Sequence, residues 1–427
     1  MFPPEIFSEI FSFLASEAHV LLACSQAHPI FAQIIEPILY AHVIVIIHDA
    51  NYEDQHHLKF KPHQLSTLLS DNPRILNYLR SLCVDLSLLD DEVLTELVAI
   101  LPRLKLERIQ LTCTDFAHWN WFDVVFRTAF VAYISTSFMK EVCIDDIYGI
   151  PLSSFANCTG LKRLTLFDSV PQSNPGPFNF PQLETLELSD WAMRDHSPVF
   201  LSWLSTHACG LRSLTLTTCT KDVIQGFLPH LLAICSISLV NLSIYYTKTS
   251  KPIYLVTRVV LTPVVLSHNA GLVEIDFPRL PSLERLRLCT YTSSSEGFSN
   301  YLVHHALIMI TQILQNLSSI KYLTLIICLR FGGDTTQIDW SPLADFLSDR
   351  RSSFQHTDLY VRAAKGGGEI SSGEVISMLS RCGNLMSLVK AGYVSVKEEK
   401  CLDVHVDRYF NTTLRSLDLP VSYHNIV

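Results

Sequence analysis

The amino-acid sequence predicts an α/β protein, in which a small three-helix module precedes a solenoid of strand–helix repeats. Two observations lead to this prediction. Three short apolar stretches with helical spacing are crowded into roughly the first forty residues. A Leu-x-x-Leu-x-Leu pattern then recurs through most of the remaining chain, which has 427 residues in all, and recurrence of this kind is typical of stacked repeats.

The first stretch, Pro3–Leu14, predicts an amphipathic helix that two prolines precede. At about 100° per residue, its apolar side chains share one broad sector and its polar side chains occupy the opposite one. The apolar set is Ile6, Phe7, Ile10, Phe11, Phe13 and Leu14. Two prolines at the start and Glu5 in the first turn suit the beginning of a helix.

Two further short helices are predicted, over Val20–Ala27 and from Phe31 to Leu39, with Pro29 between them. Three helices of this length cannot bury so much apolar surface on their own. We therefore expect a partner protein to cover part of it. The alternative, open at this point, is that the helices only cap the segment that follows.

Residues 2–40 resemble an F-box, the helical module that docks onto the Skp-family adaptor of cullin-type ubiquitin ligases. The family's opening motif lies on Phe2–Leu14, with Phe2 where leucine is usual, and its leucine–alanine–cysteine–serine segment lies on Leu22–Ser25. The Arg-x-Trp that commonly follows is replaced by Ala27–Phe31. The resemblance implies an adaptor-binding surface made of Pro3, Pro4, Ile6, Ile10, Leu14, Leu21 and Leu22.

The Leu-x-x-Leu-x-Leu pattern begins beyond residue 75. Clear copies start at Leu161, Leu183, Leu211, Leu283 and Leu414; weaker ones start at Leu79, Leu106, Met139, Leu239, Leu272, Ile320 and Leu385, and a strained one starts at Phe354. The starts at 139, 161, 183, 211 and 239 are 22, 22, 28 and 28 residues apart, close to the roughly 20–29 residues of leucine-rich repeats. Leu272 and Leu283 are too close for two repeats, so one of them is a connector.

Each copy alternates with period two and therefore predicts a short strand, with its leucines inward and its intervening residues outward. Helical return segments are expected at Asp91–Leu101, Tyr301–Leu317 and Glu374–Leu379. One unit cannot bury its own leucines, so neighbours must stack into a solenoid; a doubly wound α/β fold is the alternative. The predicted organisation is an F-box at 1–45, a linker with a helix at 46–75, and a leucine-rich-repeat-like solenoid at 76–427.

Two details of the repeat region also carry a family resemblance. The copy that starts at Leu211 continues to Cys219, as in the cysteine-containing leucine-rich repeats that commonly follow an F-box. Asn72-Pro73 and the segment Tyr78–Leu82 resemble the junction between the two modules in F-box proteins of mushroom-forming fungi. The resemblance therefore extends over most of the chain.

Composition excludes several classes of partner. Charged residues make up 17% and apolar residues 48% of the chain, which indicates a large buried core. The net charge of −9 comes without a basic run, so we expect no nucleic acid among the partners.

Residues 226–246 contain Pro229, His230 and Asn241, so we expect no membrane span there. The N-terminus carries three glutamates and no basic segment, so we expect no export signal. The expected location is the cytoplasm, the nucleus or both, with the twelve cysteines reduced.

The chain offers no clear catalytic, cofactor or metal motif. His56-His57 with His63, and His304-His305, lack a cysteine or carboxylate at ordered spacing. Gly366–Gly368 lacks the Gly-Lys-[Ser/Thr] ending of a phosphate-binding loop. Cys24, Cys83, Cys219 and Cys289 have no histidine beside them in the sequence. We expect neither cofactor nor enzymatic activity; an enzyme with a cysteine thiolate is the least favoured alternative.

The outward residues of the predicted strands give the candidate target-binding surface. Aromatic residues and arginine supply most binding hot spots, and here they are Phe167, Tyr245, Arg285, Arg287 and Tyr322. The alternative is that these side chains pack against neighbouring strands on the same face.

The resemblance implies a substrate-recognition subunit of an SCF-type ubiquitin ligase, bound to a Skp-family adaptor and through it to a cullin. The alternative is a non-catalytic repeat scaffold whose F-box-like helices do not recruit a ligase.

Overall fold

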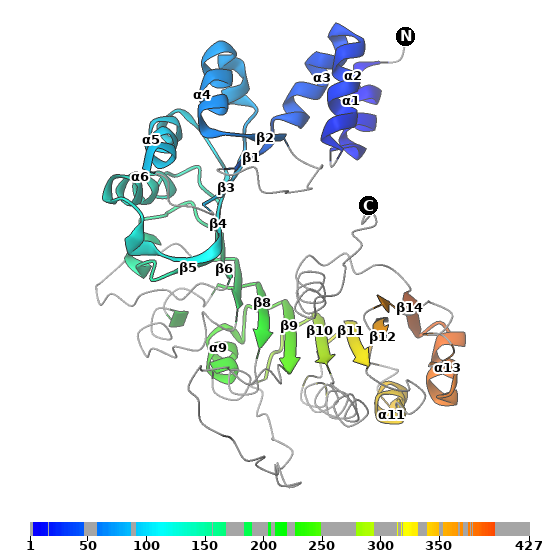
Figure 1. The fold of residues 1–427 in the computed structure, drawn as a ribbon. Coiled ribbons are helices and arrows are strands. Elements are labelled where there is room, and N and C mark those ends of the chain that lie inside the picture. Colours follow the sequence, from blue (N-terminus) through cyan, green and yellow to red (C-terminus); the bar gives the residue numbers. More distant parts are fainter. Residues whose placement is uncertain are drawn as a thin grey trace. The chain divides into compact units, whose positions relative to one another are not determined.

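Figure 1 shows the computed structural model of the chain. It divides into two compact units, unit 1 (Met1–Leu211) and unit 2 (Arg212–Val427). The residues that the structure describes are 3–15, 17–46, 58–86, 91–155, 157–167, 183–189, 204–205, 210–219, 227–248, 279–293, 314, 317, 319–331, 340–349, 353–365, 368–369, 375, 377 and 379–397.

Unit 1 begins with a helical module of three helices, α1 (Pro4–Phe13), α2 (Ala18–Ala27) and α3 (Pro29–Leu39). They occupy the three stretches predicted to be helical. Helix α3 contacts both α1 and α2, and the module's core consists of Phe11, Ala18, Leu21, Ile35 and Leu39. The side chain of His28 caps α3, because its Nδ1 accepts a hydrogen bond from the Ile30 N–H at 3.2 Å.

The rest of unit 1 is built on a parallel sheet. Its strands run in the order β2-β1-β3-β4-β5-β6-β7, and every pair in that order is parallel. The bounds are β1 (His42–Ile46), β2 (Leu58–Phe60), β3 (Ser81–Asp85), β4 (Arg108–His118), β5 (Glu141–Tyr148), β6 (Arg163–Phe167) and β7 (Thr185–Ser189). From β3 onward each strand pairs with the next one along the chain, as stacked repeats require.

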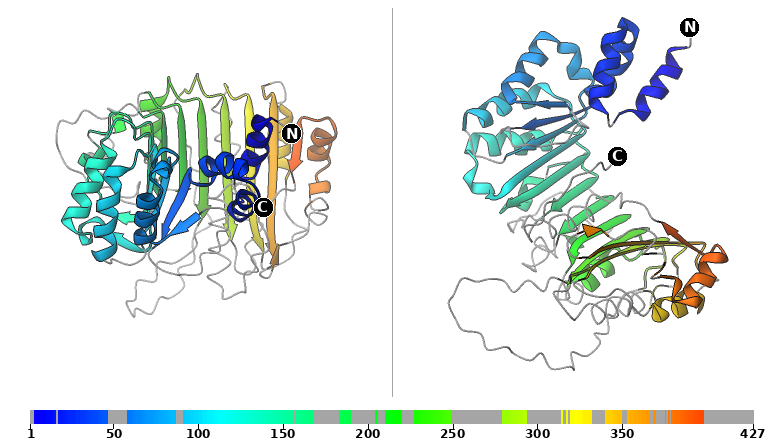
Figure 2. Two further views of the ribbon diagram at one scale, coloured as in Figure 1. Left: turned by 90° about the horizontal axis from the view of Figure 1, so that it is seen from above. Right: turned by 45° about the vertical axis from the view of Figure 1, so that its right-hand side comes forward.

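Helices return the chain between these strands. They are α4 (Pro62–Asp71), α5 (Asp91–Ile100) and α6 (Val124–Ile134), with short 3-10 turns η1 (Pro73–Asn77), η2 (Leu101–Arg103), η3 (Trp119–Trp121) and η4 (Leu152–Phe155). Helix α5 contacts both α4 and α6, and all three lie on one side of the strands (Figures 1 and 2). Helix α5 is the return segment predicted at Asp91–Leu101.

Unit 2 repeats the same plan. Its parallel strands run in the order β8-β9-β10-β11-β12-β14, and β13 adds an antiparallel hairpin to β12. The bounds are β8 (Ser213–Cys219), β9 (Asn241–Lys248), β10 (Arg285–Ser293), β11 (Tyr322–Phe331), β12 (His356–Lys365), β13 (Gly368–Glu369) and β14 (Val394–Lys397). The helices are α9 (Leu228–Cys235), α11 (Ser341–Asp349) and α13 (Gly383–Lys390).

The leucines of the repeated pattern form the core beside the strands of each unit. Strand pairing places the second apolar position of each copy side by side, as in Leu82, Ile109, Val142, Leu164 and Leu186; their exposed fractions are 1% or less. Leu242, Leu286 and Leu323 form the same kind of row in unit 2. The α/β class predicted from the sequence is confirmed, and the parallel sheets are compatible with the predicted solenoid.

A main-chain relay joins consecutive repeats just before each strand. The carbonyl of Lys140 accepts hydrogen bonds from the N–H groups of both Lys162 and Arg163, at 2.8 and 3.0 Å. The carbonyl of Lys162 does the same for Glu184 and Thr185. Further carbonyls with two such donors are those of Ala41, Arg80 and Glu107 in unit 1, and of Arg212, Val240, Glu284 and Lys321 in unit 2.

One predicted copy of the repeat is wrong. The pattern that starts at Leu385 lies in helix α13, where Leu385 and Leu388 are buried three positions apart on one helical face. The third slot of the pattern holds Lys390, so the period-two alternation that makes a strand is incomplete. The strand of this repeat is β14, which begins at Val394. The copies at Leu272 and Leu414 lie outside the described residues.

Candidate protein-binding surfaces

Helix α1 has two apolar faces side by side. The inward face carries Phe7, Phe11 and Leu14, which pack in the core of the helical module. The ring centroids of Phe7 and Phe11 lie 5.0 and 5.5 Å from that of Phe31 on α3, within the range of favourable aromatic pairs. These contacts fix the rotation of α1 about its axis.

The second apolar face of α1 is exposed. Ile6, Ile10 and Phe13 have exposed fractions of 41%, 48% and 79%, and their spacing of four and three residues places them in one line along the helix. We call these three residues the apolar stripe. Phe13 was not among the predicted adaptor-binding residues, although its position in the sequence continues the line of Ile6 and Ile10.

The predicted adaptor-binding residues divide between surface and core. Pro3, Pro4, Ile6, Ile10 and Leu22 are exposed. Leu14 is half-buried against the core, and Leu21 is fully buried in it. Leu21 therefore belongs to the core of the module and not to its exposed surface, because α2 turns this side chain inward. Ile30 at the start of α3 is a further exposed apolar residue that the prediction omitted.

The helical module is tied to the strands that follow it. Glu36 on α3 forms an ion pair with Arg74 on η1, with 2.8 Å between Oε1 and Nη2. Leu58 on β2 packs against the module's core. Burial and the nearby Glu36 carboxylate raise the pKa of Tyr40 above its ordinary value, which keeps its hydroxyl neutral. These contacts hold α1–α3 against the first strands of unit 1.

Unit 2 carries the second candidate surface, on the outward side of its strands. The first outward residues of β9 to β12 are paired in register and form a row of Asn241, Arg285, Tyr322 and His356. The second outward residues form a row of Ser243, Arg287, Thr324 and Asp358. Both rows line a cavity of about 350 Å³, which we call the β9–β12 cavity.

Two side-chain contacts order the first of these rows. The Arg285 guanidinium lies over the Tyr322 ring, with Cζ 5.1 Å from the ring centroid, the geometry of a cation–π interaction. His356 Nε2 lies 2.9 Å from Asp358 Oδ1, so the carboxylate of the cavity is paired with the imidazole. The lining thus holds two guanidinium groups and one carboxylate.

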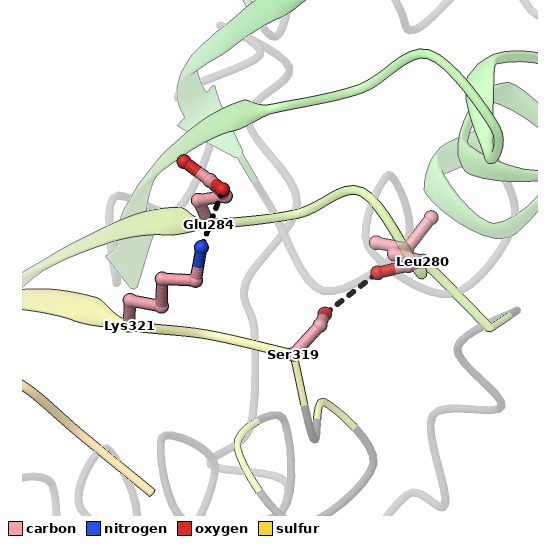
Figure 3. Close-up of polar contacts among 4 residues, drawn as sticks. All are labelled: Leu280, Glu284, Ser319 and Lys321. Carbon is pink, nitrogen blue, oxygen red and sulfur yellow. Dashed lines mark hydrogen bonds and ion pairs between the residues drawn. The ribbon is translucent and has the colours of Figure 1, made fainter.

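The segments that lead into β10 and β11 are clamped together beside this cavity (Figure 3). Lys321 Nζ lies 2.7 Å from Glu284 Oε1, and Ser319 Oγ donates a hydrogen bond of 2.7 Å to the Leu280 carbonyl. The hydrogen bond with Lys321 lowers the pKa of Glu284 and raises that of Lys321. Arg285 and Tyr322 directly follow the clamped residues, so the clamp sets the start of the first row.

The structure brings together three of the five predicted target-binding residues. Arg285, Arg287 and Tyr322 meet at the β9–β12 cavity. Phe167 and Tyr245 are only 3% and 4% exposed. They are therefore packed side chains outside the exposed surface, which fits the alternative that such residues pack against neighbouring strands. Asn241, His356 and Asp358 were missed by sequence reasoning; the signal that could have found them is their position at the first or second outward slot of a repeat.

Three of the described cysteines are held as neutral thiols. Burial raises the pKa of Cys143, raises that of Cys158 to about 11, and raises that of Cys235 to about 12, so these thiols stay protonated at neutral pH. Among the described residues no group of three or more histidine, cysteine or acidic side chains could hold a metal ion. His63 is exposed on α4, whereas His56, His57, His304, His305 and Gly366 lie outside the described residues.

A search of the described residues for membrane-spanning helices finds no candidate of sufficient length and hydropathy. Comparison of the sequence with protein-family models and with curated proteins finds no match.

Proposed function

We propose that this chain is the substrate-recognition subunit of an SCF-type ubiquitin ligase. In this proposal the helical module acts as an F-box that docks on a Skp-family adaptor and, through it, on a cullin. The strand–helix repeats act as a leucine-rich-repeat solenoid that holds a target protein. Such a complex would work in the cytoplasm, the nucleus or both.

The observation that supports the proposal most directly is the apolar stripe. A helix that packs one apolar face inside its own module and leaves a second one exposed has surface available for a partner. Full burial of a side chain such as Ile or Phe is worth about 1.5–3 kcal/mol. Burial of Ile6, Ile10 and Phe13 would therefore supply a substantial part of the affinity of a stable complex.

The chain would contribute to catalysis by proximity. It would supply no acid, base or nucleophile, and would raise the effective concentration of target lysines near a ubiquitin-charged enzyme. The contacts between α3, η1 and β2 suit this role, because they hold the docking module firmly against the first strands of unit 1.

The test is co-expression of the full chain with a Skp-family adaptor, followed by size-exclusion chromatography. We expect the two proteins to co-elute as a stoichiometric complex, and we expect Ile10→Asp to abolish co-elution, because a carboxylate in an apolar interface is costly to desolvate. Val125→Asp is the matched control: it adds the same charge at an apolar residue that is 58% exposed on α6, outside the helical module.

Two outcomes would overturn the proposal. A wild-type chain that is folded and soluble but elutes apart from the adaptor would favour the non-catalytic scaffold. Co-elution that survives Ile10→Asp would show that the apolar stripe is not the docking surface. Circular dichroism of each variant confirms that the loss of binding is not a loss of folding.

A further inference from the structure

The β9–β12 cavity combines charge, shape and ordered side chains in a way that points to a particular ligand chemistry. We propose that it binds an oxyanion, a carboxylate or a phosphate, carried on a peptide segment of the target protein. This inference deepens the proposed function, since it names the chemical class that the target-binding surface recognises.

The first argument is charge. Arg285 and Arg287 lie two residues apart on β10, so both side chains leave the same side of the sheet with their Cα atoms about 6.6 Å apart. They face one carboxylate in the lining, that of Asp358, which is held 2.9 Å from His356. The nearby Glu284 is paired with Lys321. Among the groups that line the cavity, positive charge therefore exceeds negative charge, which favours an anion.

The second argument is orientation. The Arg285 Cζ lies over the face of the Tyr322 ring, 5.1 Å from its centroid, so the ring holds the guanidinium at one place in the cavity. A planar guanidinium held in this way matches the two oxygens of a carboxylate or phosphate. Arg287 is half-buried, so an oxyanion that reached it would be partly shielded from solvent and would interact more strongly.

The third argument is the composition of the walls. Ser243 and Thr324 flank Arg287 on the neighbouring strands, and Asn241 flanks Arg285. Hydroxyl and amide groups donate hydrogen bonds to anionic oxygens. The third outward residues of β9, β10 and β11, which are Tyr245, Cys289 and Ile326, are only 4%, 5% and 1% exposed. On these strands the accessible part of the outward side is therefore confined to the first two rows, which are polar around both guanidinium groups.

The fourth argument concerns the carrier of the anion. Arg285 is exposed and Tyr322 is 39% exposed, so the mouth of the cavity is open to a macromolecule. A cavity of about 350 Å³ is at the lower end of the range for small-molecule sites, which is roughly 300–1,000 Å³, and holds one or two side chains of a peptide. An acidic or phosphorylated side chain on an extended segment fits these features.

The experiment uses the purified full chain without any adaptor, so it is independent of docking by the helical module. Three immobilised peptide libraries share degenerate flanks and differ at one central position, which is phosphoserine, glutamate or serine. Binding is measured by biolayer interferometry at two salt concentrations. We expect the phosphoserine or the glutamate library to bind at least about tenfold better than the serine library, with a preference that weakens at high salt.

Arg285→Gln and Arg287→Gln should each remove most of this preference. The matched control is Arg279→Gln, which removes the same charge from an exposed arginine outside the cavity, six residues before Arg285, and should keep the preference. Arg285 is exposed, so Arg285→Gln is expected to stay folded even if substitution of the half-buried Arg287 lowers stability. Thermal melts monitored by circular dichroism check the folding of both variants.

Equal binding to the three libraries would overturn the proposal, as would a preference that persists in both cavity variants. Isothermal calorimetry with inorganic phosphate provides the remaining arm. Phosphate that binds the chain while no peptide library does would assign the cavity to a free anion and would overturn the peptide part of the inference. A chain that fails to bind the adaptor but prefers anionic peptides would refute the ligase assignment alone.

Discussion

The guanidinium of Arg285 and the ring of Tyr322 belong to adjacent parallel strands and face each other directly, because strand pairing places the two residues side by side. The register of the sheet thus brings together a cation and an aromatic ring that are 37 residues apart in the sequence. Their contact makes Tyr322 a positioning residue for the proposed oxyanion site.

Replacement of Tyr322 by leucine is expected to weaken the binding of anionic peptides by about two- to fivefold, because a cation–π contact at an exposed site is worth about 0.5–1 kcal/mol. The variant keeps apolar bulk but no longer orients Arg285. Tyr393→Leu is the matched control, since Tyr393 has the same exposed fraction of 39% and does not line the cavity. Equal affinities for the two variants in interferometry would contradict the orienting role.

Leu21 and Ile10 should separate stability from binding in the helical module. Leu21→Ala removes a fully buried side chain and is expected to cost about 2–5 kcal/mol of local stability. Ile10→Ala acts on a side chain that is 48% exposed and should change stability by no more than about 0.5 kcal/mol. Hydrogen exchange of the α1–α3 amides measures both, and co-elution with the adaptor should weaken in Ile10→Ala although its amides stay protected.

Gly160 lies against the main chain of the preceding repeat. A Cβ atom added there would collide with the carbonyl oxygen of Ser137 and would lie 2.8 Å from that of Met139, so main-chain atoms would have to move. We expect Gly160→Ala to destabilise unit 1 by about 1–3 kcal/mol. A Cβ at Gly383 meets no atom within 4 Å, and Gly383→Ala should be neutral or stabilising by about 0.4–1 kcal/mol.

Chemical denaturation measures this difference as a shift in the unfolding midpoint. A Gly160→Ala midpoint equal to that of Gly383→Ala would show that the repeats separate at this point without cost.

Tyr133 should contribute to stability in a pH-dependent way. Its buried hydroxyl oxygen accepts a hydrogen bond from the Leu106 N–H at 3.0 Å, and burial raises the pKa of Tyr133 to about 12 from an ordinary value of 10.0. A raised pKa favours the neutral form in the folded chain, so this stabilisation is complete below pH 10 and is lost as the pH rises towards 12.

Tyr133→Phe removes the acceptor of the Leu106 hydrogen bond and should cost about 1 kcal/mol near neutral pH. It also removes the titrating group, so the free energy of unfolding of the variant should fall less steeply between pH 10 and 12 than that of the wild type. Urea denaturation at a series of pH values tests this, and parallel curves for the two proteins would contradict it.

The sequence was most informative where structure depends on neighbours along the chain. The alternation of leucines located nearly all the described strands from β3 onward, because a period of two dictates which side chains share a side of the sheet. The strand β1 was missed, although Val43, Ile44 and Val45 form a β-branched run of the kind that favours strands. The pattern at Leu385 failed because a spacing of three residues also fits a helix.

The candidate surfaces were harder to predict, since exposure depends on what packs from elsewhere in the fold. The apolar sector of α1 was predicted as a whole, but only the position of Phe31 on α3 decides that Phe7 turns inward and Ile10 outward. Phe167 and Tyr245 occupy outward slots and are nevertheless buried. Arg285, Arg287 and Tyr322 were found because they lie in the first two slots of their strands, where the sheet stays accessible.

The main-chain relay between repeats has a consequence for how such a protein can change over generations. Each joint uses only a carbonyl and two amides, so it excludes proline at the two donor positions but places no other demand on the side chains and none on the length of the return segment. Within either unit, a gene duplication that adds one strand–helix unit can use the same joint on both of its sides. Each addition would displace the recognition residues by one strand spacing, about 4.8 Å, so recombination can adjust the distance between binding groups without redesign of the core.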